Sequence, residues 1–168
     1  MPSQNQKIPN LTVCIIKNGK QEVVKLHKLL EGKKTVIFGL PGAFTPVCSN
    51  KHLPEFIKKS NEVYASKIDQ IICIAVNDPF VMNAWREHVD TNNESKIIFL
   101  CDAKAALTKK LGLQIDLSTA WLGIRCQRFM MLLDQTEITE LQKEDQVGDC
   151  IISSAENALK IVQKSMKY

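Results

Sequence analysis

Three short apolar runs, each followed closely by a helix-start signal, constrain the fold of this chain more than any other feature. The runs cover Lys34–Leu40, Gln70–Val76 and Lys96–Cys101, and their length and composition are typical of strands buried inside a sheet. A residue type that caps helix N-termini follows each run, at Thr45, Asp78 and Asp102. Strands and helices that alternate in this way predict an α/β protein with helices on both faces of its sheet.

The two ends of the chain add strands outside this alternation, so we expect a mixed sheet. Leu11–Ile16 is predicted to be the first strand, and Ile124–Leu133 is predicted to pair with Glu137–Leu141 in the antiparallel sense. A Ser153-x-x-Glu156 capping box then opens the last helix. The chain has 168 residues, of which 45% are hydrophobic, and that is enough for one core. We therefore expect residues 1–168 to form a single domain.

The charge and hydropathy patterns argue against nucleic-acid and membrane roles. The net charge is only +4, and the lysines are scattered rather than gathered into a patch. No apolar run approaches the roughly 18 residues of a membrane-spanning helix, and no Gly-rich phosphate-binding motif is present. Residues 1–10 are polar and lack the apolar core of a signal sequence. We expect a cytoplasmic protein, with a mitochondrial or peroxisomal location as the alternative if a targeting segment has been removed.

Six cysteines are spread along the chain, at positions 14, 48, 73, 101, 126 and 150. No C-x-x-C is present, and Cys48 with His52, four residues later, is too small a set for a metal site. We therefore expect neither a metal nor another cofactor. Most of the cysteines stand in apolar runs, where cysteine packs as a small hydrophobic residue.

Cys48 differs from the others because it falls in the first turn of a predicted helix. Thr45 is the expected cap and Pro46 the first helical residue. Unpartnered backbone N–H groups and the positive end of the helix dipole meet at this turn, and both favour the nucleophilic thiolate. We expect the Thr45 hydroxyl to reach the same sulfur, and Pro41 and Pro46 to stiffen the loop around it. The alternative is that Cys48 only fills a helix start.

An arginine in an apolar strand gives a second indication of a reactive site. In the run from Arg125 to Leu133, alternation puts Cys126, Arg128 and Met130 on one face. A buried guanidinium needs an anionic partner, and a thiolate would serve. Arg125 is the rival candidate. The alternatives for Arg128 are exposure at a sheet edge and pairing with a carboxylate.

The spacing Pro41-x-x-x-Thr45-x-x-Cys48 resembles the Pro-x-x-x-Thr/Ser-x-x-Cys signature of peroxiredoxins. Residues 52–54 and 122–129 are similar to the type II, or peroxiredoxin-5-like, subgroup, and the similarity covers nearly all 168 residues. The chain departs from the usual residues of that subgroup at Glu55, Cys101 and Trp121.

The resemblance implies a thioredoxin-like fold and an antioxidant enzyme that reduces hydrogen peroxide and alkyl hydroperoxides. Cys48 would be the peroxidatic cysteine and would become a sulfenic acid. Thr45 and Arg128 would orient and polarise the peroxide, beside Pro41. Thioredoxin, or glutaredoxin with glutathione, would be the reductant. The alternative from another class is a non-enzymatic, redox-regulated thioredoxin-fold protein that binds partners or acts as a chaperone.

A second thiol must resolve the sulfenic acid, and the sequence leaves three sources open. Cys150 lies in a polar run that we expect to be exposed, at a position similar to that of the second cysteine in animal peroxiredoxin-5 proteins. Cys73 follows Cys48 by 25 residues, as in plant-like members, but stands in a strand that we expect to be buried. An external thiol is the third source. We favour Cys150.

Type II members commonly form homodimers near the active site, which implies a homodimer here. Phe44, Phe80 and Trp85 are the candidate contact residues, and core packing is the favoured alternative for Trp85. His52 and His88 have no catalytic partner in the sequence, and we expect both to be structural.

Overall fold

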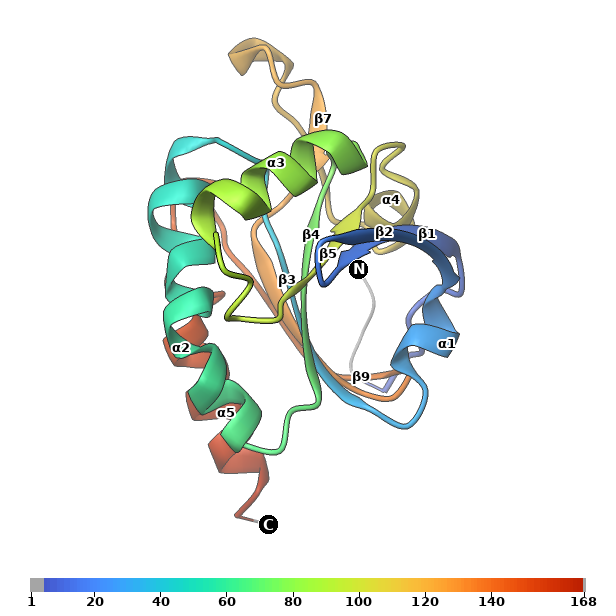
Figure 1. The fold of residues 1–168 in the computed structure, drawn as a ribbon, viewed down its shortest axis with the longest axis vertical. Coiled ribbons are helices and arrows are strands. Elements are labelled where there is room, and N and C mark those ends of the chain that lie inside the picture. The colour runs from blue at the N-terminus through green and yellow to red at the C-terminus, as the bar shows by residue number, and fades with distance from the viewer. Residues whose placement is uncertain (1–4, 168) are drawn as a thin grey trace.

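The computed structural model describes residues 5–167. Residues 1–4, which begin the polar segment considered above, and residue 168 lie outside the described residues. A seven-stranded sheet in the order β2-β1-β5-β4-β3-β8-β9 forms the centre of the molecule (Figure 1). Its strands are β1 (Thr12–Lys17), β2 (Lys20–Lys25), β3 (Lys34–Gly39), β4 (Gln70–Ala75), β5 (Ile98–Cys101), β8 (Phe129–Asp134) and β9 (Glu137–Lys143).

The sheet is mixed, as the sequence predicts. Strands β3, β4 and β5 run parallel, while β1 joins β5, and β8 joins β3, in the antiparallel sense. The three apolar runs supply the three parallel strands, which are buried along their whole length apart from Lys34. Parallel strands are covered on both faces, and this explains why their sequences are almost continuously apolar.

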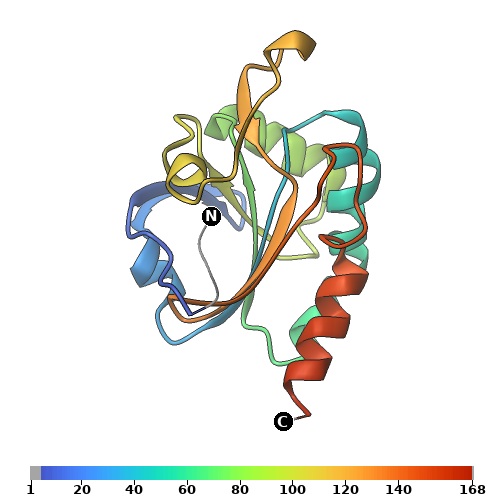
Figure 2. The same cartoon turned by 180° about the vertical axis from the view of Figure 1, so that it is seen from behind.

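Helices cover both faces of the sheet (Figures 1 and 2). They are α1 (Leu26–Leu30), α2 (Leu53–Ala65), α3 (Pro79–Val89), α4 (Ala106–Lys110) and α5 (Ala155–Ser165). On one face α2, α3 and α5 bury Phe56, Trp85 and Leu159 in a common core with Phe38 of β3. On the other face α1 and α4 bury a second apolar cluster. Within residues 5–167, no helix combines the length and the apolar character needed to cross a bilayer.

The predicted strand 124–133 is in fact two strands that belong to different sheets. β7 (Ile124–Cys126) pairs with β6 (Gln114–Asp116) in a small sheet that projects from the top of the molecule (Figures 1 and 2). β8 begins at Phe129 in the central sheet. Between them the Gln127 N–H donates to the Leu113 carbonyl, and the Arg128 carbonyl accepts from the Glu144 N–H. Arg128 therefore stands where the chain passes from one sheet to the other.

Besides Thr45, the sequence predicts helix caps at Asp78, Asp102 and Ser153, with different outcomes. The Asp102 carboxylate accepts from the N–H groups of Leu107 and Thr108 in α4, although Ala105 is the residue directly before that helix. The Asp78 carboxylate accepts hydrogen bonds from the N–H groups of Phe80 and Val81 and caps α3 as predicted. The predicted capping box at Ser153 is wrong by one residue. The cap of α5 is Ser154, whose hydroxyl accepts from the Asn157 N–H, because the Ser153 hydroxyl donates to Glu144 instead.

Candidate active site

The first turn of the helix that follows β3 holds Cys48. The helix begins at Pro46, as predicted, and its first intrahelical bond runs from the Ser49 N–H to the Thr45 carbonyl. Cys48 therefore belongs to the first turn, where backbone N–H groups have no partner within the helix. These N–H groups carry the positive end of the helix dipole and favour an anion at the same place.

The helix then contains a π-helical turn, η1 (Cys48–His52), before it continues as α2. The Leu53 N–H donates to the Cys48 carbonyl, five residues back. Pro54, the next residue, has no N–H to donate, so the regular α-helical bond to the Asn50 carbonyl cannot form. A π turn of this kind is wider than an α turn and is frequent at functional sites. Here it brings the side chains of Cys48 and His52 to the same interior point.

The Cys48 sulfur meets a buried guanidinium. Arg128 Nη2 donates a hydrogen bond to Cys48 Sγ at 3.3 Å. Cys48 is 1% exposed and Arg128 is 2% exposed. The guanidinium also donates to the Val147 carbonyl, from Nε at 3.2 Å and from Nη2 at 3.0 Å. The sulfur therefore has a buried cation as its direct neighbour.

His52 completes the surroundings of the guanidinium. Arg128 Nη1 donates to His52 Nδ1 at 3.0 Å, and His52 Nε2 lies 2.9 Å from the Ser153 carbonyl oxygen. Arginine only donates and a carbonyl only accepts, so Nδ1 is the bare nitrogen and Nε2 carries the proton. Burial, assisted by the Arg128 charge, lowers the pKa of His52 to about 3. The ring is therefore neutral and holds the guanidinium in place.

The expectation that His52 is only structural missed this contact. The available signal was its spacing, because a residue four positions after Cys48 returns to the same side of a helix. The partner that gives the ring its role, Arg128, is 76 residues away in sequence.

The other predicted site residues shape the loop before the helix. The Thr45 hydroxyl donates to the Gly42 carbonyl at 2.7 Å rather than capping the helix. Pro41 is buried, and its carbonyl accepts a hydrogen bond from Arg125 Nη1 at 3.3 Å. A Cβ at Gly42 would lie 2.5 Å from the same Nη1 and would push the guanidinium out of this position. Arg125, the rival of Arg128, thus holds the loop, while Arg128 contacts the sulfur.

The aromatic residues divide between core and surface. Trp85 is fully buried and packs edge-on against Phe99, and its Nε1–H donates to Ser49 Oγ at 2.9 Å. The core alternative for Trp85 is therefore confirmed. Phe44 and Phe80 are 52% and 79% exposed.

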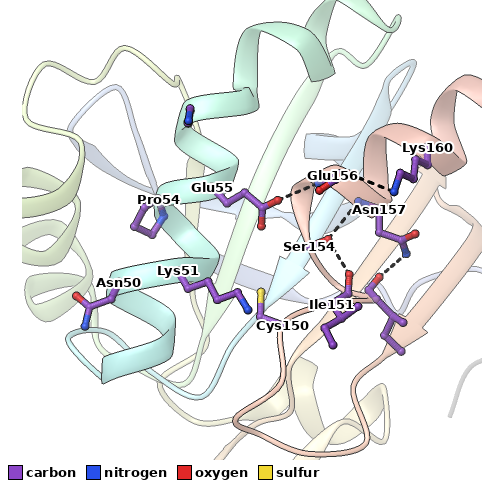
Figure 3. Close-up of a pocket in the computed structure, with 12 residues that line it drawn as sticks. Asn50, Lys51, Pro54, Glu55, Cys150, Ile151, Ser154, Glu156, Asn157 and Lys160 are labelled. Atoms are coloured by element: carbon purple, nitrogen blue, oxygen red, sulfur yellow. Dashed lines mark hydrogen bonds and ion pairs between the residues drawn. The ribbon is translucent and has the colours of Figure 1, made fainter.

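The prediction that Cys150 is exposed is wrong, since its exposed fraction is 3%. Glu144 is responsible, because its carboxylate accepts from the N–H groups of Ile151 and Ser153 and folds the polar run inward. Cys150 lines a surface cavity of about 580 Å³ together with Lys51, Glu55 and others (Figure 3). Figure 3 shows the Lys51 side chain extending toward the Cys150 thiol. Burial raises the pKa of this thiol to about 11, although the Arg128 charge opposes the shift.

Cys73 is buried in β4, as predicted, and belongs to the same core cluster as Cys48. Burial, with Cys48 nearby, raises the pKa of the Cys73 thiol well above its ordinary value. All six cysteines lie within the described residues, and all six are free thiols.

Comparison with known proteins relates this geometry to one family. The Redoxin family matches residues 3–159 of the chain. Peroxiredoxin-2D of Arabidopsis thaliana is 43% identical over 154 residues, which cover 91% of this chain and 93% of that protein. Peroxiredoxin-2C of Oryza sativa subsp. japonica is 46% identical over 141 residues, which cover 84% and 85%.

A solved structure agrees over the whole length of the chain. Reduced Prx3 of Vibrio vulnificus, crystallised in complex with H₂O₂, superposes with a TM-score of 0.90 at 34% sequence identity. The match covers 100% of both chains.

Proposed function

Because the chain belongs to the Redoxin family as a type II peroxiredoxin with a thioredoxin-like fold, and is therefore a thiol-dependent peroxidase, we propose that Cys48 is its peroxidatic cysteine. The observation that supports this most directly is the 3.3 Å contact between Arg128 Nη2 and Cys48 Sγ, made between two buried groups. The substrate is a hydroperoxide and the reductant a thiol. The relatives do not favour the alternative of a non-enzymatic binding or chaperone protein.

In the proposed first step the Cys48 thiolate attacks one oxygen of the hydroperoxide. A sulfur–oxygen bond forms while the oxygen–oxygen bond breaks, and the leaving oxygen takes a proton to become water or an alcohol. The sulfur loses two electrons and becomes a sulfenic acid. Arg128 and the N–H groups of the helix start are the donors that stabilise the charge on the departing oxygen. Because the site is buried, these donors act in a low dielectric, where they are stronger than in water.

The remaining site residues act in this proposal by orienting the donors. His52 is a positioning residue, because its neutral ring fixes the Arg128 guanidinium through the 3.0 Å contact at Nδ1. Thr45 has its hydroxyl proton engaged by Gly42, so its oxygen is left to accept from an incoming hydroperoxide. Pro41 and Arg125 stiffen the loop that carries Thr45.

We assign the resolving role to Cys150. Its loop is held at two places by the site itself, since Arg128 donates to Val147 and His52 donates to Ser153. A disulfide requires Cα atoms within about 7 Å, and in this proposal the π turn beside Pro54 opens when Cys48 is oxidised so that Cys48 and Cys150 can meet. Opening it disturbs the contacts of Arg128 and His52 and releases the Cys150 loop at the same moment.

The finer assignments follow from the resemblance to type II members. We propose that residues 1–168 act as one domain, that thioredoxin or glutaredoxin with glutathione is the reductant, and that two copies form a homodimer. The exposed rings of Phe44 and Phe80 are the contact residues we assign to that dimer. We propose a cytoplasmic location.

Replacement of Cys48 by serine tests the central assignment. Cys48→Ser is expected to abolish peroxide reduction while the circular dichroism spectrum and melting temperature stay close to those of the original protein. Cys126→Ser, at another buried cysteine, is the matched control and should retain activity. Peroxide turnover by the Cys48→Ser protein would reject the proposal.

Mass spectrometry of the original protein after one equivalent of peroxide tests the resolving cysteine. It should show a Cys48–Cys150 disulfide, and a Cys48–Cys73 disulfide would overturn the choice of Cys150.

A further inference from the structure

Cys14 and Cys101 form a cysteine pair away from the Cys48 site. Cys14 lies in β1 and Cys101 in β5, and the two residues are direct partners in the antiparallel ladder between these strands. Directly opposed residues in such a ladder have Cα atoms about 4.5–5.5 Å apart. A disulfide needs a Cα separation of roughly 4.4–6.8 Å. The backbone is therefore already in position for a covalent link.

The two side chains also lie on one side of the ladder. Directly opposed residues point to the same face of a sheet, so the Cys14 and Cys101 side chains are neighbours across β1 and β5. Both pack against the same apolar cluster, Cys101 as a buried member and Cys14 as a partly buried neighbour. The two side chains therefore share one side of the β1–β5 ladder.

Solvent reaches this pair through a surface cavity of about 380 Å³, lined by Cys14 and Cys101 with Val23, Pro79 and Lys104 among others. Cys14 is half-buried, whereas Cys101 is 6% exposed. Burial, followed by the proximity of Cys14, raises the pKa of the Cys101 thiol to about 12. Cys14 is therefore the more accessible of the two thiols and the first that an oxidant in the cavity would reach. The Lys104 ammonium also lines this cavity.

We propose that Cys14 and Cys101 are a second redox centre, which hydroperoxides convert into an intrachain disulfide across the β1–β5 ladder. Cys14 attacks one peroxide oxygen, the oxygen–oxygen bond breaks, and the other oxygen leaves as water or an alcohol. The Cys101 sulfur then attacks the Cys14 sulfenic acid, and hydroxide leaves with the Cys101 proton as water. Overall, two thiols lose two electrons and one hydroperoxide gains them.

This centre is separate from the peroxidase cycle. Cys101 is protonated at neutral pH, and a thiol in this state reacts slowly, so the disulfide forms only under sustained peroxide. Once formed, it closes a loop from residue 14 to residue 101 and fastens the β1–β2 hairpin to the parallel strands. Closure of so long a loop is expected to raise the melting temperature by about 5–10 °C.

The test uses the full chain with Cys48→Ser, so that the oxidation of Cys48 neither consumes the peroxide nor exchanges with other thiols. The reduced protein is treated with excess hydrogen peroxide, alkylated, digested without reductant and mapped by mass spectrometry. The expected product is a peptide pair joined through Cys14 and Cys101 that has lost two hydrogen atoms, from protein that still migrates as a single chain. Its melting temperature should rise by the expected amount and return after reduction.

Two matched variants decide the interpretation. Cys14→Ser changes a half-buried residue and should fold normally, and Cys101→Ala keeps a small apolar side chain in the core. Each should lose both the joined peptide and the thermal shift. Alkylated Cys14 and Cys101 after the treatment, or a disulfide from either residue to another cysteine or another chain, would overturn the proposal. A joined peptide without any thermal shift would overturn the fastening of the hairpin.

Discussion

Cys48 and Cys150 are both almost fully buried, and the Arg128 guanidinium acts on both, but in different ways. At Cys48, Nη2 donates a hydrogen bond directly to the sulfur at 3.3 Å. At Cys150 the guanidinium acts from a distance, and burial outweighs it, so that the pKa of Cys150 rises to about 11. Arg128 binds the Cys150 loop instead through the Val147 carbonyl.

This difference teaches that burial on its own raises the pKa of a thiol, and that the direct Arg128 donor is what distinguishes Cys48 in the proposed mechanism. Two other buried cysteines follow the same rule. Burial raises the pKa of Cys126 to about 12 and that of Cys73 well above its ordinary value. The same arginine therefore donates directly to one thiol and holds the loop that carries a second one.

Removal of the guanidinium should have the largest effect. Arg128→Gln is expected to slow Cys48 oxidation by about 10²–10³, the usual cost of losing one preorganised donor. Arg125→Gln is the matched control, because Arg125 donates to the Leu122 and Pro41 carbonyls and not to the sulfur. Stopped-flow measurement of the first oxidation step checks both variants. Equal losses in the two would contradict the role given to Arg128.

How far the sequence predicts this molecule depends on the range of the interactions involved. The strands β3 and β4 and the Asp78 cap follow from local patterns, and all three are confirmed. The break at Arg128 was missed, because it depends on hydrogen bonds to Leu113 and Glu144 that no local pattern encodes.

The same distinction applies to the site. The sequence predicts Cys48 and Arg128 as a pair, because a helix start favours a thiolate and a buried arginine needs an anion, and the structure brings the two side chains together. The burial of Cys150 was not predicted, since it depends on the Glu144 carboxylate meeting the N–H groups of Ile151 and Ser153. A polar run suggests exposure until such a partner is known.

His52 contacts both the Arg128 guanidinium and the Ser153 carbonyl of the Cys150 loop. Protonation of His52 should have the next largest effect, on the free energy of unfolding. The folded protein keeps the ring neutral with a pKa of about 3, while the unfolded chain takes up a proton near pH 6.5. Between these values the unfolded state binds more protons, so stability falls as the pH drops below about 6.5. By pH 5 the loss due to His52 should be roughly 2 kcal/mol.

Urea unfolding at pH 7 and pH 5 measures this loss. His52→Asn is the matched variant, because its amide oxygen still faces Arg128 but does not titrate. The difference in stability between the two pH values should shrink by about the predicted 2 kcal/mol in the variant. An unchanged difference would mean that another group causes the acid sensitivity and that His52 is not the neutral partner of Arg128.

Cys150→Ser should slow the resolution of oxidised Cys48 without changing the rate at which Cys48 is first oxidised. The first oxidation of Cys48 is expected to be unchanged, because the hydrogen bond found to the Cys48 sulfur within residues 5–167 comes from Arg128 and not from Cys150. Turnover supported by thioredoxin should fall by about an order of magnitude, equivalent to roughly 1.4 kcal/mol in the barrier. Cys73→Ser is the control that should keep full turnover. The opposite pattern, with loss only in the Cys73 variant, would transfer the resolving role to β4.

The smallest expected effect is on the free energy of unfolding, from the hydrogen bond that joins α3 to the helix turn of Cys48. The Trp85 Nε1–H donates to Ser49 Oγ at 2.9 Å, so α3 holds the residue next to Cys48. Trp85→Phe removes this hydrogen bond but also core volume, and Ser49→Ala removes the same bond while the core stays filled. A double-mutant cycle isolates the shared term, which should be about 0.5–1.5 kcal/mol in unfolding free energy. A coupling energy near zero would show that the Cys48 turn stands without α3, and would leave the guanidinium as the main difference between the two cysteines.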